Sequence, residues 1–260
     1  MGDFELVESA MSVARVPCRS LRSIKVTPNY VSAGRGVVTV HRRWISEIGL
    51  ASLIGITGWE VPMGLIQTGD GLIATGAVEY LHFGAESINA HSTRKLYFEF
   101  RRDATCASRG FAEAESISLL AYKWPVEDVD KFRVSRYSDR AETTLSQIHD
   151  FIDEPGGTGE WCAFAQSMTN ERFGTDSSIA WEALEVIEEG TARRSIDVRV
   201  PSNRRRLRSN DVVSAWLGSK KQAEGGSVES YYSACTLLER VAYGRHEDGE
   251  LFLTMYFSEV

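Results

Sequence analysis

The sequence lacks the short motifs by which many enzymes can be identified. There is no Gly-x-Ser-x-Gly turn, and neither glycine cluster carries the Lys-Ser/Thr pair of a Walker phosphate loop or the full GxGxxG fingerprint. None of the histidines falls in HxH, HExxH or HxxxH spacing; they are His41, His82, His91, His149 and His246. No local metal site is therefore predicted, and any active site has to be assembled by the fold.

Paired cysteines, an export signal and a membrane span are also lacking. The cysteines, Cys18, Cys106, Cys162 and Cys235, show no CxxC spacing, which argues against a zinc ribbon or a disulfide framework and favours a reducing compartment. The opening Met1–Glu5 is acidic, unlike the basic start of a signal peptide. Glu47, Glu60 and Pro62 interrupt the only apolar window long enough to cross a bilayer. These features predict a cytoplasmic protein without a membrane span.

What the sequence does contain is the composition of a globular protein. It has 260 residues, a net charge of −7, 43% hydrophobic residues and 25% charged residues. This is enough apolar material for one large domain or two small ones, and it excludes wholesale disorder. The acidic balance does not by itself indicate a nucleic-acid partner.

The densest apolar stretch, Ile45–Phe83, is interrupted by glycines every few residues. Because each glycine inside a helix costs about 1 kcal/mol relative to alanine, the pattern predicts short buried strands joined by glycine turns. In particular, Val61–Gln67 and Leu72–Phe83 are predicted to form a hairpin. Gly69 and Gly71 would then be needed for folding, because the turn between these strands requires positive φ.

Further strands are predicted on both sides of this stretch, and together they make residues 1–137 a β-rich region. Their short lengths and near-regular spacing favour a sandwich or a barrel-like antiparallel sheet. The predicted strands are Leu21–Val31, Val37–His41, Lys95–Arg101, Ser116–Trp124 and Lys131–Tyr137.

Residues 138–260 are predicted to be mainly helical, since the apolar spacing changes to the helical period near Asp139. The expected helices are Asp139–Glu154, Trp161–Met168, Ser178–Glu189, Asp211–Leu217 and Ser227–Tyr243, and the expected strands are Ser195–Val200 and Leu251–Phe257. The last strand is apolar on both faces and has to pair with an earlier one. The fold class is therefore predicted as α+β, with the two regions packed as one unit.

Few residues in this pattern suggest chemistry. Cys162 would stand at a helix N-terminus and could pair with His82 or His149, although a small core residue is the favoured interpretation. His82 lies in an apolar strand and is predicted to be a core histidine. Asp197–Arg199 resembles the acid-x-base strand of some nucleases, but no earlier acid can be assigned to it. The catalytic residues are therefore unknown at this point.

The most unusual local feature of this acidic sequence is a cluster of basic residues. Four arginines, Arg204, Arg205, Arg206 and Arg208, lie between a predicted strand and a predicted helix. Arginine forks suit phosphate groups, so phosphate or single-stranded nucleic-acid binding is one interpretation. The favoured alternative is a solvated loop that forms salt bridges with the acidic face of Ser178–Glu189.

Taken together, these patterns favour a binding protein over an enzyme. The predicted function is a non-enzymatic interaction or assembly protein on a β-sandwich-like scaffold, with an RNA-binding, viral structural or movement-type role by analogy of architecture. Protein partners or self-assembly are expected, and no cofactor or metal is predicted. The alternative hypothesis is a hydrolase or metal-dependent nuclease whose acids and histidines meet only in the fold.

Overall fold

The computed structural model describes residues 3–88, 91–104, 117–153, 159–176, 179–204 and 236–259. Their ten strands follow the hydrogen-bonded order β1-β10-β9-β8-β7-β6-β5-β4-β3-β2, which closes into a barrel. Every strand pair whose register is described is antiparallel. Strands therefore occur throughout the chain, and the predicted α+β fold with a mainly helical second half is wrong.

The helices and strands have the following bounds. The strands are β1 (Cys18–Val26), β2 (Val31–His41), β3 (Val78–Ile88), β4 (His91–Phe100), β5 (Ile117–Pro125), β6 (Arg133–Thr144), β7 (Ala180–Glu188), β8 (Arg194–Arg199), β9 (Thr236–Arg245) and β10 (Leu251–Glu259). The helices are α1 (Asp3–Val13), α2 (Arg42–Ile48), α3 (Leu50–Thr57), α4 (Leu65–Ala74), α5 (Leu145–Asp153), α6 (Gly159–Phe173) and the short 3₁₀ helix η2 (Ser202–Arg204). None of the helices among these described residues has the length and hydrophobicity that a membrane span requires.

The prediction of strands over Ile45–Phe83 is mostly wrong, because helices α2, α3 and α4 occupy residues 42–74. Three of its glycines, Gly49, Gly58 and Gly64, have positive φ and stand at the ends of these helices. Glycine at a helix end costs little because it adopts left-handed conformations readily. The glycines therefore separate short helices, and only the end of the stretch enters strand β3.

Gly69 and Gly71 lie inside α4, so the predicted hairpin turn does not exist. A Cβ atom at Gly69 would overlap the Leu50 side chain and lie 2.8 Å from Cζ of Phe98, whereas one at Gly71 would meet no atom within 4 Å. Gly69 is thus required for the close approach of α4 to its neighbours, and Gly71 is not.

The second half differs from its prediction where helical spacing also fits a strand. Ser178–Glu189 contains strand β7, in which Glu188 is buried beside Arg193 and Ile187 is 49% exposed. Because the buried position holds an acid and the exposed position an apolar residue, the hydrophobic pattern of the sequence does not show the two-residue period of this strand. Ser227–Tyr243 becomes strand β9 from Thr236 onward, and its earlier residues lie outside the described ranges.

Other expectations for this half are confirmed in part. Asp139–Glu154 is helical only from Leu145, because β6 continues through Thr144. Trp161–Met168 lies within α6, and the strands predicted at Ser195–Val200 and Leu251–Phe257 correspond to β8 and β10. Asp211–Leu217 lies outside the described residues.

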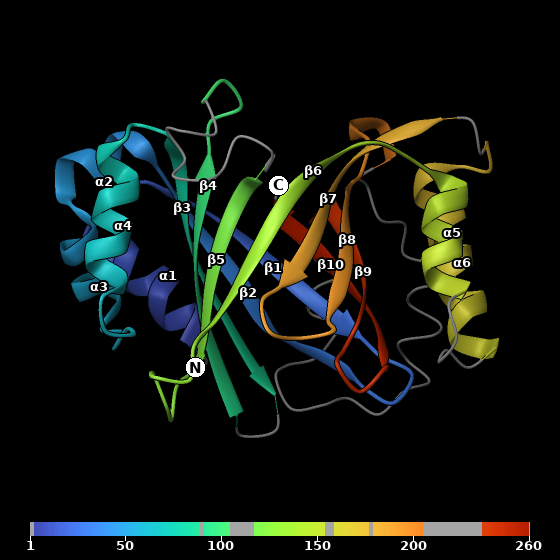
Figure 1. Ribbon diagram of the computed structural model, residues 1–260, viewed down its shortest axis with the longest axis horizontal. Coiled ribbons are helices and arrows are strands. Elements are labelled where there is room, and N and C mark those ends of the chain that lie inside the picture. Colours follow the sequence, from blue (N-terminus) through green and yellow to red (C-terminus); the bar gives the residue numbers. More distant parts are fainter. Residues whose placement is uncertain are drawn as a thin grey trace. The chain divides into compact units, whose positions relative to one another are not determined.

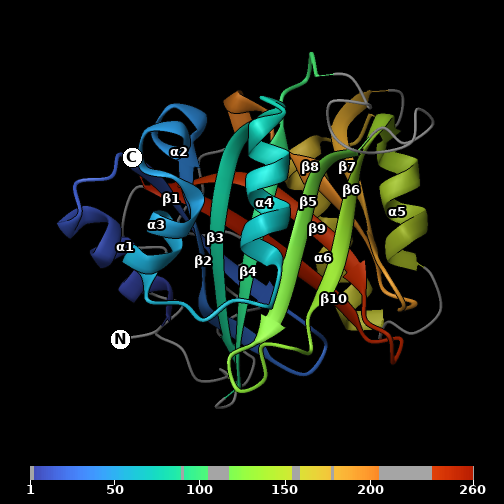
Figure 2. The ribbon, with the colours of Figure 1, turned by 60° about the vertical axis from the view of Figure 1, so that its left-hand side comes forward.

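The chain divides into two compact units. Unit 1 comprises Met1–Ser20 and Arg35–Asp139, and unit 2 comprises Leu21–Gly34 and Arg140–Val260. In unit 1, helices α2, α3 and α4 lie on one side of strands β2–β5, where they enclose a hydrophobic core (Figures 1 and 2). In unit 2, α5 and α6 pack against each other and complete a second core. The division into 1–137 and 138–260 stays a prediction.

We expect Gly69→Ala to destabilise the protein by about 1–3 kcal/mol, the usual range for overpacking a close contact. Gly71→Ala is the matched control in the same helix, and it should raise the unfolding free energy by up to about 1 kcal/mol through helix propensity. Denaturant unfolding of both variants measures the difference. Equal effects of the two substitutions would contradict the packing role of Gly69.

Candidate functional site

The strands of unit 1 have one apolar and one polar face. Core residues such as Val40, Leu81 and Phe98 point toward the helices. The residues that alternate with them form the opposite side of the sheet, here called the polar face, because successive strand residues point to opposite faces. Strand register places the polar-face residues side by side in rows that run across β2, β3, β4, β5 and β6.

One row of the polar face, here called the cation row, consists of Lys95, Lys123 and Arg133. Lys95 stands directly opposite Lys123, and Lys123 directly opposite Arg133. Lys95 is 8% exposed and Lys123 is 7% exposed. Three cations thus lie side by side on one face of the sheet, and this arrangement is suited to binding an anion.

Glu86 ties this row to Arg35 on β2. Its Oε2 lies 2.5 Å from Nζ of Lys95 and 3.1 Å from Nη2 of Arg35. All three side chains are buried or nearly so. A carboxylate shared by two cations fixes both of them in place, and rigid cations are better prepared to bind a phosphate group than mobile ones.

Thr39 and His82 stand opposite each other in the next row, and they form a hydrogen-bonded series with Glu99, which lies one row further along β4. Nδ1 of His82 lies 2.9 Å from Oγ1 of Thr39, and Nε2 lies 2.8 Å from Oε2 of Glu99. An ionised carboxylate only accepts hydrogen bonds. Nε2 of His82 therefore carries the hydrogen and donates a hydrogen bond to Glu99. In the neutral ring Nδ1 then accepts from the Thr39 hydroxyl. His82, predicted to be a core histidine, is instead a polar-face residue with both ring nitrogens engaged.

Aromatic rings extend from His82 in both directions across the polar face and form an aromatic series. Ring centroids lie 5.3 Å apart for His41 and Tyr80, 6.2 Å for Tyr80 and His82, 6.1 Å for His82 and Tyr97, and 6.2 Å for Tyr97 and Tyr137. Such rings offer π faces that attract a cation or stack on an aromatic ligand.

Gly84 makes room for one of these rings. A Cβ atom at this position would lie 3.0 Å from Cε2 of Tyr97. The backbone of β3 therefore has to lack a side chain here for the Tyr97 ring to lie beside the cation row.

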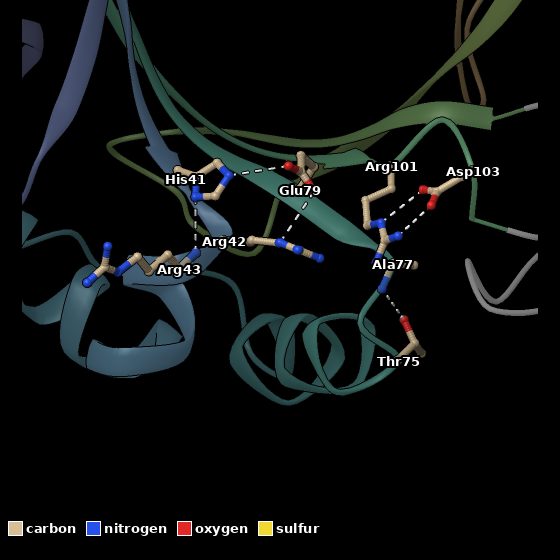
Figure 3. Close-up of polar contacts among 8 residues, drawn as sticks. All are labelled: His41, Arg42, Arg43, Thr75, Ala77, Glu79, Arg101 and Asp103. Atoms are coloured by element: carbon tan, nitrogen blue, oxygen red, sulfur yellow. Dashed lines mark hydrogen bonds and ion pairs between the residues drawn. The ribbon is translucent and has the colours of Figure 1, made fainter.

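The polar face ends at a cluster of paired charges, here called the charged edge, which Figure 3 shows. It consists of His41, Arg42, Glu79, Arg101 and Asp103. Nε2 of His41 lies 3.2 Å from Oε1 of Glu79, whose Oε2 lies 3.6 Å from Nε of Arg42. Arg101 lies just beyond the end of β4, where its backbone N–H donates a hydrogen bond to the carbonyl of Ala77 just before β3.

Arg101 and Asp103 form the second pair of the charged edge. Nε of Arg101 donates a 2.9 Å hydrogen bond to Oδ1 of Asp103, and a second donor of the guanidinium group reaches Oδ2. These hydrogen bonds lower the pKa of Asp103 and raise that of Arg101. Opposite charges placed side by side are complementary to a ligand that itself carries a carboxylate or an ammonium group.

The other residues that the sequence suggested do not converge on a site. The Cys162 thiol donates to the carbonyl of Ile152 and packs against the core of unit 2. Asp197 lies 3.6 Å from a guanidinium nitrogen of Arg240. In the described part of the chain, no group of three or more His, Cys, Asp or Glu side chains is arranged to hold a metal.

Most of the arginine-rich loop lies outside the described residues. Arg204 ends η2, and Arg205, Arg206 and Arg208 lie outside the described residues.

The residues that sequence reasoning missed are those of strand β4. Its alternate positions are Lys95, Tyr97, Glu99 and, just beyond the strand, Arg101. The strand was predicted, but its alternating pattern alone does not indicate that one of its faces carries functional side chains.

Comparison with known proteins gives a structural likeness alone. No protein-family model matches the sequence, and no curated protein matches it. The apo form of the prenyltransferase PriB has a TM-score of 0.57 and 15% identity, covering 92% of this chain and 80% of that chain. For 5-dimethylallyltryptophan synthase from Streptomyces coelicolor the TM-score is 0.54 and the identity 11%, covering 92% and 81%.

A ternary complex of PriB with L-tryptophan and dimethylallyl thiolodiphosphate has a TM-score of 0.51 and 13% identity, covering 93% of this chain and 79% of that chain. At these identities the likeness shows a shared fold. It contradicts the prediction of a viral-type, RNA-binding β-sandwich with an assembly role, because the scaffold on which that analogy rested is not present. Of the two hypotheses, the alternative of a hydrolase or metal-dependent nuclease with a site assembled only in the fold agrees better with these findings.

We expect inorganic pyrophosphate to raise the melting temperature of the protein, because the cations of the row would bind it. A ligand at a hundred times its Kd stabilises by about 2.7 kcal/mol. Lys123→Met should lose most of this gain, because it removes one of the cations of the row.

Lys131→Met is the matched control, since Lys131 lies before β6 and its side chain is 78% exposed. Its response to pyrophosphate should equal that of the wild type. A wild type whose melting temperature does not respond to pyrophosphate would contradict the assignment of the cation row as an anion site.

Proposed function

We propose that the protein transfers a prenyl group from a prenyl diphosphate to an aromatic acceptor. The observation that carries this proposal is the order of the rows on the polar face. The buried lysines Lys95 and Lys123 lie beside a histidine–glutamate pair and a series of aromatic rings. These are the groups that a diphosphate donor and an aromatic acceptor require. The fold shared with PriB and 5-dimethylallyltryptophan synthase supports the same class of reaction.

The cation row would bind the diphosphate of the donor. When the bond between the allylic carbon and the diphosphate oxygen breaks, both bonding electrons leave with the diphosphate. Lys95, Lys123 and Arg133 would stabilise the negative charge that develops there, since strand register holds the three residues side by side before the reaction begins.

The allylic fragment that remains carries a positive charge and needs protection from water. Tyr97 stands one row away from Lys95, at the distance of two strand residues, which is about 7 Å. Its ring, together with those of Tyr80 and Tyr137, would attract the cation through its π face. The acceptor ring would lie over the same part of the polar face.

The reaction is completed when a carbon of the acceptor ring attacks the allylic carbon. A new carbon–carbon bond forms, and the ring then loses the proton from the attacked carbon, whose electron pair restores aromaticity. The imidazole of His82 would take up this proton, and Glu99, hydrogen-bonded to its Nε2, would stabilise the charge that results. The products are the prenylated aromatic compound and diphosphate, and no further reactant is consumed.

The proposal is tested by incubating the protein with dimethylallyl diphosphate and a panel of indoles and phenols. We expect an acceptor-dependent product with the mass of one added dimethylallyl group, together with release of diphosphate. Glu99→Gln should lower kcat by about 100-fold or more, as expected when the carboxylate that supports the basic histidine is removed. If no donor and acceptor pair yields a product, the proposed function is wrong.

We further propose that the acceptor bears a carboxylate, as L-tryptophan does in the PriB complex. Arg101 would bind this group, because it lies at the charged edge, just beyond the end of β4 and two residues after Glu99. We expect Arg101→Gln to raise KM for L-tryptophan by about tenfold, the loss of one charge-assisted hydrogen bond, while KM for indole stays unchanged.

Arg43→Gln is the matched control for this substitution. Arg43 lies close to the same edge in Figure 3, but its side chain is 70% exposed and paired with Glu47. Its KM for L-tryptophan should equal that of the wild type. An equal rise in KM for L-tryptophan and for indole in Arg101→Gln would instead indicate a general loss of structure.

A further inference from the structure

The proton lost by the acceptor needs a defined receiving atom, and the hydrogen bonds around His82 restrict the choice. Nε2 of His82 already donates to Glu99, so this nitrogen has no free electron pair with which to take a proton. Nδ1 is the basic nitrogen, and it lies 2.9 Å from the hydroxyl oxygen of Thr39. A proton that reaches the ring at Nδ1 along this hydrogen bond has to come from Thr39.

The geometry points to Thr39 as a catalytic residue that passes the proton from the acceptor to His82. This inference rests on the proposed prenyl transfer. Thr39, His82 and Glu99 then form a hydroxyl–imidazole–carboxylate relay of the kind that is recognised by geometry and role. Thr39 and His82 are directly opposite residues of β2 and β3, so two rigid strands hold the hydroxyl against the ring.

The protons and electrons of the step balance. The C–H bond at the attacked carbon breaks and its electron pair returns to the acceptor ring. The proton goes to Oγ1 of Thr39 while the hydroxyl proton of Thr39 moves to Nδ1 of His82. The imidazolium that forms is stabilised by Glu99, which stays ionised. After the product leaves, the imidazolium returns its proton to solvent and the relay is restored.

A hydroxyl group suits this position because it donates and accepts. It donates to Nδ1 when the ring is neutral and accepts from Nδ1 when the ring is charged. Valine has nearly the same shape but can do neither. Serine keeps the hydroxyl and loses only a methyl group, so the pair Thr39→Val and Thr39→Ser separates the role of the hydroxyl from that of packing.

The kinetic test measures kcat and KM of both variants with the best acceptor. Thr39→Val should lower kcat by about 100-fold with little change in KM, and Thr39→Ser should keep most of the activity. A solvent isotope effect on kcat should be present in the wild type and in Thr39→Ser. If Thr39→Val keeps its kcat, or if KM rises in place of the fall in kcat, the relay is overturned.

A second measurement does not depend on activity. In ¹⁵N spectra of histidine-labelled protein, the His82 signals can be assigned by their loss in His82→Asn. We expect a protonated Nε2 and an unprotonated, hydrogen-bonded Nδ1 in the wild type, and the Nδ1 signal should move to the value of a free nitrogen in Thr39→Val. A proton on Nδ1 of the neutral ring would overturn the inference.

The two measurements also separate this inference from the proposed function. If the spectra are as expected but no acceptor is prenylated, the hydrogen bonds are correct and the prenyl-transfer reaction is wrong; the relay, as a step of that reaction, is then overturned with it. If prenylation occurs and Thr39→Val is fully active, the function stands and the relay is wrong.

Discussion

The two-residue period of the strands in unit 1 is the constraint on which the site depends. It sends Leu81, Phe83, Leu96 and Phe98 into the core that the helices cover, and in doing so it sends His82, Lys95, Tyr97 and Glu99 to the other face. The hydrophobic effect fixes the first set, because burying apolar surface is the main favourable contribution to folding. The polar set is thereby placed without a comparable driving force of its own. It includes Lys95 and Lys123, two buried lysines that stand opposite each other.

In this sheet, the register of the strands determines the order in which charged and aromatic side chains follow one another across the polar face. From Arg35 and Glu86, past the cation row, to His82, Glu99 and the charged edge, the polar face changes from strongly basic to aromatic to paired charges. Neighbouring rows are about 7 Å apart, so a ligand with an anionic end and an aromatic end would contact both kinds of row at once. The order of the rows therefore supports a bimolecular reaction between a diphosphate and an aromatic ring. The structural likeness by itself supports only the fold.

Each carboxylate on the polar face has a partner that limits what it can do. Glu86 is shared by Arg35 and Lys95 and has a structural role in positioning them. Glu99 accepts a hydrogen bond from Nε2 of His82 and thereby determines which ring nitrogen is basic. Glu79 bridges His41 and Arg42 at the charged edge. Three acids that look equivalent in the sequence thus have three different roles, because pairing and burial decide the chemistry of a carboxylate.

The sequence by itself determined the strands with clear alternation, such as Lys95–Arg101 and Leu251–Phe257, and the lack of any local metal, phosphate or nucleophile motif. It did not determine the helices of residues 42–74, since glycine marks both helix ends and hairpin turns, and only packing such as that of Gly69 against Leu50 separates the two. Nor did it reveal β7, where Glu188 is buried and Ile187 exposed. The site was decided by tertiary structure alone. Thr39, His82 and Glu99 meet because long-range hydrogen bonds set the register of β2, β3 and β4, and no local spacing encodes a contact between residues so far apart in the chain.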